Sequence, residues 1–228
     1  MQRLLGEIRR TDEEYGLIQA GERIAVGVSG GKDSLALLML LARYRAFSPR
    51  PFTLCALTVS PAPGFDTVPI AALCGEWDVP YRVEETRLMD TVLRAPHPCA
   101  LCARLRRGTL LRMAAENGAQ KLALGHHRDD VMETWLMSAL NEGRFNRLPP
   151  IAPMARAGIS VIRPLWNARE EAIADLARRY ELPVVKNPCP VDGYTRRAEI
   201  RAHLDALERA EPGAKEKLWA ALKREQRE

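Results

Sequence analysis

The sequence contains no long hydrophobic segment. Its longest apolar run, Leu35 to Ala42, has eight residues, far short of the ~20 that a helix needs to cross a bilayer. The first residues turn acidic at Glu7 and lack the apolar core of a secretory signal. We therefore expect no membrane partner and a cytoplasmic location.

The chain also lacks internal repeats, low-complexity linkers and an even set of cysteines. Five cysteines in 228 residues, in a chain without an export signal, argue against a disulfide framework and for metal binding or reactive thiols. The composition, with 46% hydrophobic and 28% charged residues, is that of a globular protein. Its length suits one sizeable domain, or one domain with a small appendage.

Neither sign of charge dominates, since the net charge is +5 and the pI about 9.1. The arginines nevertheless gather in two segments, which contain Arg104, Arg106, Arg107 and Arg112, and Arg196, Arg197 and Arg201. Such clusters can hold a phosphate backbone. A solvated helix face whose arginine stems cover apolar surface explains them equally well, and the sequence leaves both explanations open.

Short β-branched runs alternate with longer helical patterns along most of the chain. The predicted strands cover residues 24–28, 53–59, 81–84, 121–125 and 159–162. The predicted helices cover residues 2–19 (with a break near Thr11), 34–44, 68–77, 104–117, 130–140, 170–180, 195–209 and 214–226. We expect residues 86–101 to be irregular and residues 183–185 to form a short extended piece. This alternation predicts βαβ crossovers in a doubly wound α/β fold, with a mainly parallel five-stranded sheet covered on both faces.

The only candidate boundary lies near residues 187–190, where the α/β pattern gives way to helices alone. We therefore divide the chain into an N-terminal helical segment (residues 1–22), a main α/β domain (residues 23–187) and a helical C-terminal tail (residues 188–228).

A glycine-rich loop follows the first predicted strand and opens the next helix. It consists of Ser29, Gly30, Gly31, Lys32, Asp33 and Ser34. The glycines let a ligand approach the main chain, and the loop amides at a helix N-terminus offer donors to an anion. The serine hydroxyls and Lys32 add to this, while Asp33 is suited to act through Mg²⁺ or to orient a neighbour. The Walker spacing is absent, and the bland alternative is a tight turn that simply needs two glycines.

Residues 25–34, Ala-Val-Gly-Val-Ser-Gly-Gly-Lys-Asp-Ser, resemble the signature of the N-type ATP pyrophosphatases, the PP-loop family. The resemblance implies an adenine nucleotide alpha hydrolase-like fold and cleavage of ATP between its α- and β-phosphates. It implies that the 29–34 loop holds the pyrophosphate while a substrate oxygen attacks the α-phosphorus, with Lys32 and Asp33 as catalytic residues. Binding the leaving group suits this chemistry, because negative charge builds there as the bond breaks.

Three of the cysteines are candidate metal ligands. Cys99 and Cys102 form a Cys-x-x-Cys pair ahead of a basic helix, a spacing at which two thiolates can hold one metal. The pair alone does not distinguish zinc, an iron–sulfur cluster, a redox dithiol and chance. Cys189 is a third candidate, whereas Cys55 in a strand and Cys74 in a helix are better explained as small core residues.

Three further segments sharpen the resemblance: the run that starts at Cys99, residues 124–130 (Leu-Gly-His-His-Arg-Asp-Asp) and residues 162–165 (Ile-Arg-Pro-Leu). Together they resemble the tRNA 2-thiocytidine synthetase branch of the family, from about Leu4 to Leu207. The resemblance implies that Cys99, Cys102 and Cys189 bind a [4Fe-4S] cluster with one iron left open. It also implies ATP and Mg²⁺, a tRNA substrate and a sulfur donor such as a cysteine desulfurase or free sulfide; a homodimer is compatible with it.

Residues 124–130 end the fourth predicted strand at the sheet edge where ligands of α/β folds usually bind. Gly125 would let a nucleotide approach the backbone. Asp129 and Asp130 are candidates for Mg²⁺, although Asp130 is also suited to be a helix N-cap. Ser60, at the end of the second predicted strand, is expected to contact the adenosine.

Other polar side chains keep open roles. His126 and His127 are candidates for proton transfer, but a structural role explains them as well. Arg163 precedes a helix and is expected to join the pocket wall. Arg106 and Arg107 are suited either to steer RNA or to support the negative charge of a cluster.

The combined prediction is an ATP-dependent tRNA sulfurtransferase that forms AMP and pyrophosphate. It would adenylate C2 of a tRNA cytidine and replace the oxygen with sulfur by means of an iron–sulfur cluster. Two alternatives stay open. One is another PP-loop enzyme that thiolates or amidates a different base or a small molecule. The other is a non-catalytic, metal-dependent tRNA-binding protein.

Overall fold

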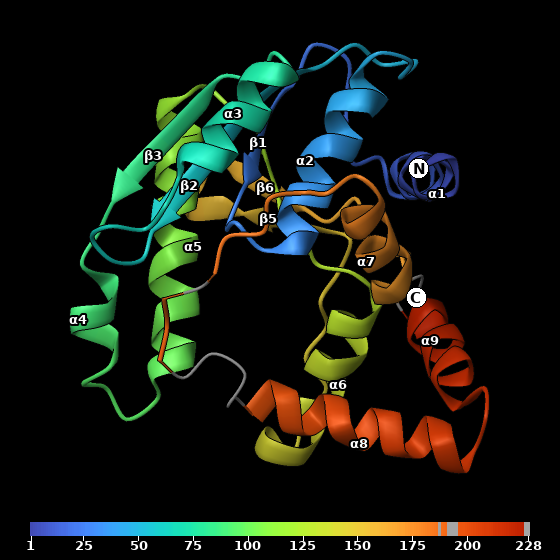
Figure 1. The fold of residues 1–228 in the computed structure, drawn as a ribbon. Helices are drawn as coiled ribbons and strands as arrows, with labels where there is room; N and C mark the ends of the chain where they lie inside the picture. Colours follow the sequence, from blue (N-terminus) through green and yellow to red (C-terminus); the bar gives the residue numbers. More distant parts are fainter. Residues whose placement is uncertain (187, 191–195, 226–228) are drawn as a thin grey trace.

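The computed structural model describes residues 1–186, 188–190 and 196–225. At its centre is a six-stranded sheet in the order β3-β2-β1-β4-β6-β5 (Figure 1). The strands are β1 (Arg23–Gly27), β2 (Thr53–Ser60), β3 (Tyr81–Glu85), β4 (Lys121–Ala123), β5 (Ile151–Met154) and β6 (Ile159–Ile162). All neighbouring pairs are parallel except β5 and β6, which are antiparallel. The doubly wound α/β fold is confirmed.

The predicted count of five strands is wrong by one, because β5 was missed. This strand has only four residues, includes Pro153 and follows two further prolines. Proline cannot donate to a ladder, so it weakens a strand pattern and is tolerated at a sheet edge. β5 is such an edge strand, paired only with β6.

The helices are α1 (Gln2–Tyr15), α2 (Lys32–Arg45), α3 (Val68–Glu76), α4 (Leu88–Val92), α5 (Pro98–Glu116), α6 (Arg128–Glu142), α7 (Glu170–Arg179), α8 (Arg196–Ala210) and α9 (Ala214–Glu225), with a short 3₁₀ turn η1 (Ala155–Ala157). None of the helices in the described residues is long and apolar enough to cross a membrane. The break expected near Thr11 is absent, because α1 is one continuous helix. The Thr11 hydroxyl donates to the Glu7 carbonyl within it.

The region expected to be irregular, residues 86–101, instead contains α4 and the start of α5. Pro98 occupies the first turn of α5, where its missing N–H and fixed φ favour a helix start. Cys99 and Cys102 therefore lie on the first turns of a long helix. Residues 183–185, expected to be extended, lie outside any strand.

Two hydrophobic layers cover the sheet, because alternate residues of each strand face opposite sides. In β1, Ile24 and Val26 pack into one layer, with helices α1, α2, α3 and α7. Ala25 packs into the other, with α4 and α5. A third cluster joins α6, α8 and α9 around Trp166 and Trp219, and Figure 1 shows these three helices beside the sheet. The three-part division of the chain stays a prediction.

The sheet order fixes where a ligand site can form. From β1 the chain continues outward to β2 and β3, then returns to β4 on the other side of β1. The loops that follow β1 and β4 therefore leave the carboxyl edge of the sheet side by side, at a topological switch point. Ligands of open α/β sheets bind in the crevice at such a point.

Candidate functional site

The loop of residues 29–34 leaves β1 and runs directly into α2. Its two serines brace it: the Ser29 N–H donates to Ser34 Oγ at 3.0 Å, and Ser34 Oγ donates to the Gly31 carbonyl at 2.9 Å. The Gly31 N–H is bonded to Ser29 Oγ at 3.3 Å. The hydroxyls that were expected to bind an anion therefore hold the loop's shape.

The start of α2 keeps open donors. The first backbone bond of this helix runs from the Leu35 N–H to the Gly31 carbonyl at 3.1 Å, and Gly31 provides no side-chain cap. Within the described residues, the N–H groups of Lys32, Asp33 and Ser34 donate to no protein group. Three unused amides at a helix N-terminus form an anion-binding position.

Two glycines allow the backbone to come this close. Gly30 has φ +82°, and a Cβ on it would lie 3.0 Å from the Cβ of Val185. The Val185 N–H also donates to the Gly30 carbonyl at 2.9 Å. A Cβ on Gly125, at the end of β4, would lie 3.0 Å from the Asp33 carbonyl carbon and 3.1 Å from the Ser34 nitrogen. The loop is thus clamped between the β4–α6 turn and the segment that leads to Cys189.

A cavity of about 510 Å³ lies beside this loop. Its wall contains Ser29, Asp33 and Ser34 from the loop, and Gly125, His126 and Asp130 from the β4–α6 turn. The same cavity is also lined by Cys99 and Cys102 from α5 and by Cys189. The structure therefore brings the loop and all three candidate cysteines to one cavity, although they are far apart in the sequence.

The three thiols are close enough to influence one another. Burial raises the pKa of the Cys102 thiol, the charge of Arg106 opposes this, and Cys189 and Cys99 raise the pKa further. Within the described residues, no three His, Cys, Asp or Glu side chains are gathered tightly enough to hold a metal ion. The donor set itself, three sulfurs on one cavity wall, is of the kind that holds an iron–sulfur cluster or zinc. Cys55 and Cys74 are buried, as expected of core residues.

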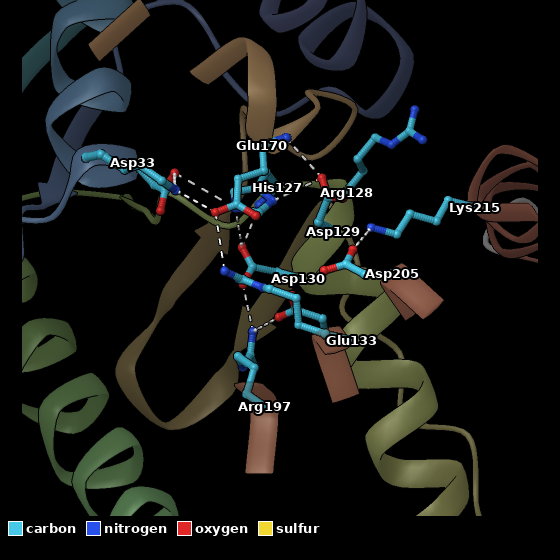
Figure 2. Close-up of polar contacts among 12 residues, drawn as sticks. Asp33, His127, Arg128, Asp129, Asp130, Glu133, Glu170, Arg197, Asp205 and Lys215 are labelled. Carbon is cyan, nitrogen blue, oxygen red and sulfur yellow. Dashed lines mark hydrogen bonds and ion pairs between the residues drawn. The ribbon is translucent and has the colours of Figure 1, made fainter. Parts of the chain in front are cut away.

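A network of charged side chains joins Asp33 of the loop to the start of α6 (Figure 2). His127 is at its centre: Nε2 lies 3.8 Å from Asp33 Oδ1 and 3.4 Å from Asp130 Oδ2, and Nδ1 lies 3.6 Å from Asp129 Oδ2. Burial lowers the pKa of His127, but its close contact with Asp129 and the charges of the three carboxylates outweigh this and raise it.

The neighbouring groups shift in the directions that this network dictates. Burial by itself would raise the pKa of Asp129, but the contact with His127 and the hydrogen bond from the Glu170 backbone N–H lower it to about 2. The pKa of Asp130 is also lowered, because the charges of the histidines and Arg197 outweigh its burial. For His126, burial lowers the pKa to about 4, so its imidazole is neutral at pH 7.

Residues 5–207 match the family model of the PP-loop domain. The chain belongs to the PP-loop family. Among similar proteins, the tRNA-cytidine(32) 2-sulfurtransferase of Geobacter metallireducens is 39% identical, over 94% of this chain and 86% of its own length. The protein of the same name from Cereibacter sphaeroides is 34% identical, over 96% of this chain and 77% of its own. The predicted branch of the PP-loop family is confirmed.

A solved structure in the family supports the same assignment. The U34-tRNA thiolase NcsA from Methanococcus maripaludis, determined with its [4Fe-4S] cluster, superimposes with a TM-score of 0.77 at 28% identity. The match covers 99% of this chain and 80% of that one. The predicted enzyme class, a tRNA sulfurtransferase, agrees with the names of these relatives.

The PP-loop lysine is held away from the cavity. Lys32 Nζ lies 2.8 Å from Asp33 Oδ1 and 2.8 Å from Glu170 Oε1, and it is not among the cavity-lining residues. Burial lowers the pKa of Lys32, but the two carboxylates outweigh this and raise it. Lys32 is therefore a charged group bound to carboxylates in this state.

Several polar residues occupy positions other than those expected. Asp130 is not the N-cap of α6: that position belongs to His127, whose N–H donates to Asp130 Oδ2 at 3.0 Å in a capping box. Asp129 accepts the Glu170 N–H at 2.9 Å and so caps α7. Ser60 is buried and donates to the Ala62 carbonyl at 2.8 Å, while its neighbours Val59 and Pro61 line the cavity. Its contact with adenosine stays a prediction.

The sequence analysis missed Glu170 altogether, and it named Arg201 as a candidate phosphate-binding residue without foreseeing its role in the network. Glu170 binds Lys32 across 138 positions of sequence, and Arg201 binds the buried Glu133 with Nε to Oε1 at 2.6 Å. No local motif marks either residue, because each acts only through long-range packing of α7 or α8 on α6 and the loop.

Proposed function

We propose that this chain is an ATP-dependent tRNA thiolase that replaces the C2 oxygen of a tRNA cytidine with sulfur. The names of its relatives support the substrate and the reaction class. One observation carries the mechanistic proposal: residues of the PP-loop and all three candidate cysteines line a single cavity. A substrate base held there would contact the adenylating and the sulfur-bearing groups without leaving the site.

The loop would bind the phosphates of ATP. The amides of Lys32, Asp33 and Ser34 are available donors at a helix N-terminus. Asp33 and Asp130 are the carboxylates that line the cavity, and they are the proposed contacts of Mg²⁺. Lys32 would exchange Glu170 for a phosphate oxygen, so that its charge stabilises the departing pyrophosphate.

The first chemical step would be adenylation. The C2 oxygen of cytosine attacks the α-phosphorus, the bond to the β-phosphate oxygen breaks, and pyrophosphate leaves. This step is needed because an amide-like oxygen is a very poor leaving group, whereas AMP is a good one. The amides and Lys32 act on charge that develops in the transition state, which is where such groups lower a barrier most.

Cys99, Cys102 and Cys189 would hold a [4Fe-4S] cluster by three of its irons. When bound, such a group supplies sulfur chemistry at an iron without a protein thiolate. The chain's own contribution is to hold the base between the loop and α5 and to exclude water, which would otherwise hydrolyse the adenylate. Displacement of AMP by sulfide leaves a thiocarbonyl at C2.

The alternatives make different use of the same cavity. A PP-loop enzyme that amidates its substrate would have no need for three thiols on the cavity wall. A tRNA-binding protein without turnover would release neither AMP nor pyrophosphate. The sulfur donor (a cysteine desulfurase or free sulfide), a homodimeric state and a cytoplasmic location stay predictions.

The deciding experiment is a thiolation assay under anaerobic conditions with protein purified without oxygen. An unmodified tRNA transcript, ATP, Mg²⁺ and sulfide are supplied, and both AMP and 2-thiocytidine are measured by mass spectrometry. We expect the wild-type chain to form both products and Cys102→Ser to lose at least about 100-fold in thiolation.

Cys74→Ala is the matched control, because Cys74 is buried away from the cavity. It should retain the wild-type rate per folded molecule. Thiolation by Cys102→Ser at the wild-type rate would remove the cysteines from the mechanism, and a wild-type chain that releases no AMP with tRNA would refute the adenylation step.

A further inference from the structure

The two arginine clusters of the sequence have different surroundings in the structure. The cluster on α8 is neutralised internally. Arg197 lies 2.7 Å from Asp130 Oδ1, Arg201 lies 2.6 Å from Glu133 Oε1, and Arg196 contacts Glu199. These guanidinium groups hold α8 against α6 and leave little charge for an external partner.

The arginines of the α4–α5 side are different. Arg94, Arg104 and Arg107 are exposed. In the part of the chain that the structure describes, none of the three has a carboxylate within 4.0 Å or a hydrogen-bond partner for its guanidinium group. Arg112, farther along α5, instead pairs with Glu84 and Glu116. We call Arg94, Arg104 and Arg107 the α4–α5 rim.

The rim borders the cavity. Arg107 itself lines the cavity, and Arg104 precedes it by three positions, so the two side chains lie on one face of α5. Arg94 directly follows Leu93, another cavity-lining residue. The cysteine-bearing turn of α5 lies between these positions in the sequence. A chain of anionic groups crossing the rim would therefore pass the entrance to the thiols and the loop.

The chemistry of the rim matches a phosphodiester backbone. Arginine presents a planar fork of donors that fits a phosphate, and unpaired exposed arginines attract a polyanion strongly. A single nucleotide would not need them, because the loop already offers amides for its phosphates.

We infer that the α4–α5 rim binds the tRNA backbone on either side of the reacting base and directs that base into the cavity. This inference rests on the proposed function, since it assumes a tRNA substrate.

The test is the salt dependence of tRNA binding by the full chain, purified without oxygen. The probe is an unmodified tRNA transcript, measured by fluorescence anisotropy between 50 and 200 mM salt, a range in which phosphate contacts dominate the change. For Arg94→Gln/Arg104→Gln we expect a dissociation constant raised on the order of tenfold. The slope of log K against log salt should also fall by about 2, one for each phosphate contact removed.

Two comparisons separate charge from damage to the fold. Arg43→Gln/Arg179→Gln removes the same charge from exposed arginines on α2 and α7, which have no ion-pair partner among the residues that the structure describes. These helices cover the opposite face of the sheet, so this variant should bind tRNA like wild type. Arg94→Lys/Arg104→Lys keeps the charge and should restore most of the slope.

Equal slopes for the rim variant and the α2–α7 control would overturn the inference. So would a rim variant that binds tRNA normally but loses only the rate with a protein sulfur donor, because the rim would then be a protein-docking surface. A wild-type chain whose tRNA binding depends steeply on salt but which forms no 2-thiocytidine would refute the proposed function. The salt dependence of binding by the variants would still decide the role of the rim.

Discussion

Gly125 shows how one missing side chain supports the site. Its Cα faces the backbone of Asp33 and Ser34, so a methyl group there would meet main-chain atoms at 3.0 to 3.1 Å. Backbone cannot rotate out of the way as a side-chain tip can, and the loop would have to shift. We expect Gly125→Ala to weaken ATP binding at least about tenfold and to cost about 1–3 kcal/mol of stability, as measured by calorimetry and urea unfolding.

Gly75 in α3 provides the control for that substitution. A Cβ on it would meet no atom within 4 Å, and its φ is not positive. Gly75→Ala should leave ATP binding unchanged and raise the free energy of unfolding by roughly 0.5–1 kcal/mol, as alanine favours a helix over glycine. Equal effects of the two variants on ATP binding would show that the contact with the loop is unimportant.

His126 gives the chain a component of stability that depends on pH. Its folded-state pKa is about 4, against 6.5 for the free side chain, because it is buried and near Arg163 and Arg197, with Asp130 opposing. A depressed pKa means that the unfolded chain binds the proton more tightly. This component is therefore fully present above pH 6.5 and is lost as the pH falls toward 4, by up to about 3 kcal/mol.

Urea unfolding of wild type and His126→Gln at pH values between 7.5 and 4 measures this component. The difference in the free energy of unfolding between the two proteins isolates the contribution of His126. The contribution of His127, whose pKa is raised, has the opposite sign but is present in both proteins and cancels. We expect wild type to lose more stability than the variant on acidification. Parallel curves would show that His126 titrates normally in the folded chain.

Helix α8 is attached to the main domain by charge as well as by apolar packing. Glu133 is 1% exposed, and its carboxylate depends on Arg201 at 2.6 Å and Arg197 at 3.5 Å. Removing one partner leaves a buried charge without compensation, which is more costly than removing the pair. We expect Arg201→Gln to lower the free energy of unfolding by about 3 kcal/mol, in denaturant melts at pH 7.

Adding Glu133→Gln to Arg201→Gln should restore most of that loss, because the buried charge is then gone. The four proteins of this double-mutant cycle give the coupling between the two helices directly. Additive effects would mean that α8 is held by its apolar residues, Ile200 and Leu204, without help from the ion pair.

The helices and strands were predictable where the local pattern is strong. Strands β1, β2, β4 and β6 are apolar and buried, and their neighbours supply long helical patterns. The sequence analysis failed for β5 and α4, which have four and five residues. Elements this short are stabilised by their sheet partner or by the packing of neighbouring helices, and neither influence is visible in a local pattern.

The candidate site was likewise predictable from the sequence only where a local motif marks it. The loop and the cysteine pair lie in compact motifs, so sequence alone located them, and the sheet order then brought them to one cavity. Glu170 and Arg201 escaped because their roles arise from contacts across 138 and 68 positions. For Asp130 only the alternative role as N-cap is wrong, since the cap of α6 depends on backbone angles that the motif does not specify, and its role toward Mg²⁺ stays a prediction.

For the molecule as a whole, the first and third hydrophobic clusters are joined, because Tyr15 packs against both. The C-terminal helix α9 belongs to the third cluster and also pairs with the N-terminal helix, through Lys223 Nζ and Glu14 Oε2 at 3.1 Å. Figure 1 shows α1 and α9 on the same side of the molecule. The site depends on this arrangement, because α6 presents Asp130 to the cavity at one end and packs on α8 and α9 along its length.

This arrangement predicts that the C-terminal helices unfold together with the α/β domain. Trp219 of α9 lies against Trp166, with ring centroids 4.5 Å apart, and below the guanidinium of Arg128. Trp219→Ala should lower the free energy of unfolding by about 3–5 kcal/mol. Unfolding should remain a single transition with a lower urea midpoint, and near- and far-ultraviolet circular dichroism should give the same midpoint. Tyr180→Ala, at a position that is 42% exposed, should have little effect. Two separate transitions in wild type, with only the first sensitive to Trp219→Ala, would instead make the tail an independent unit and uncouple its folding from the site.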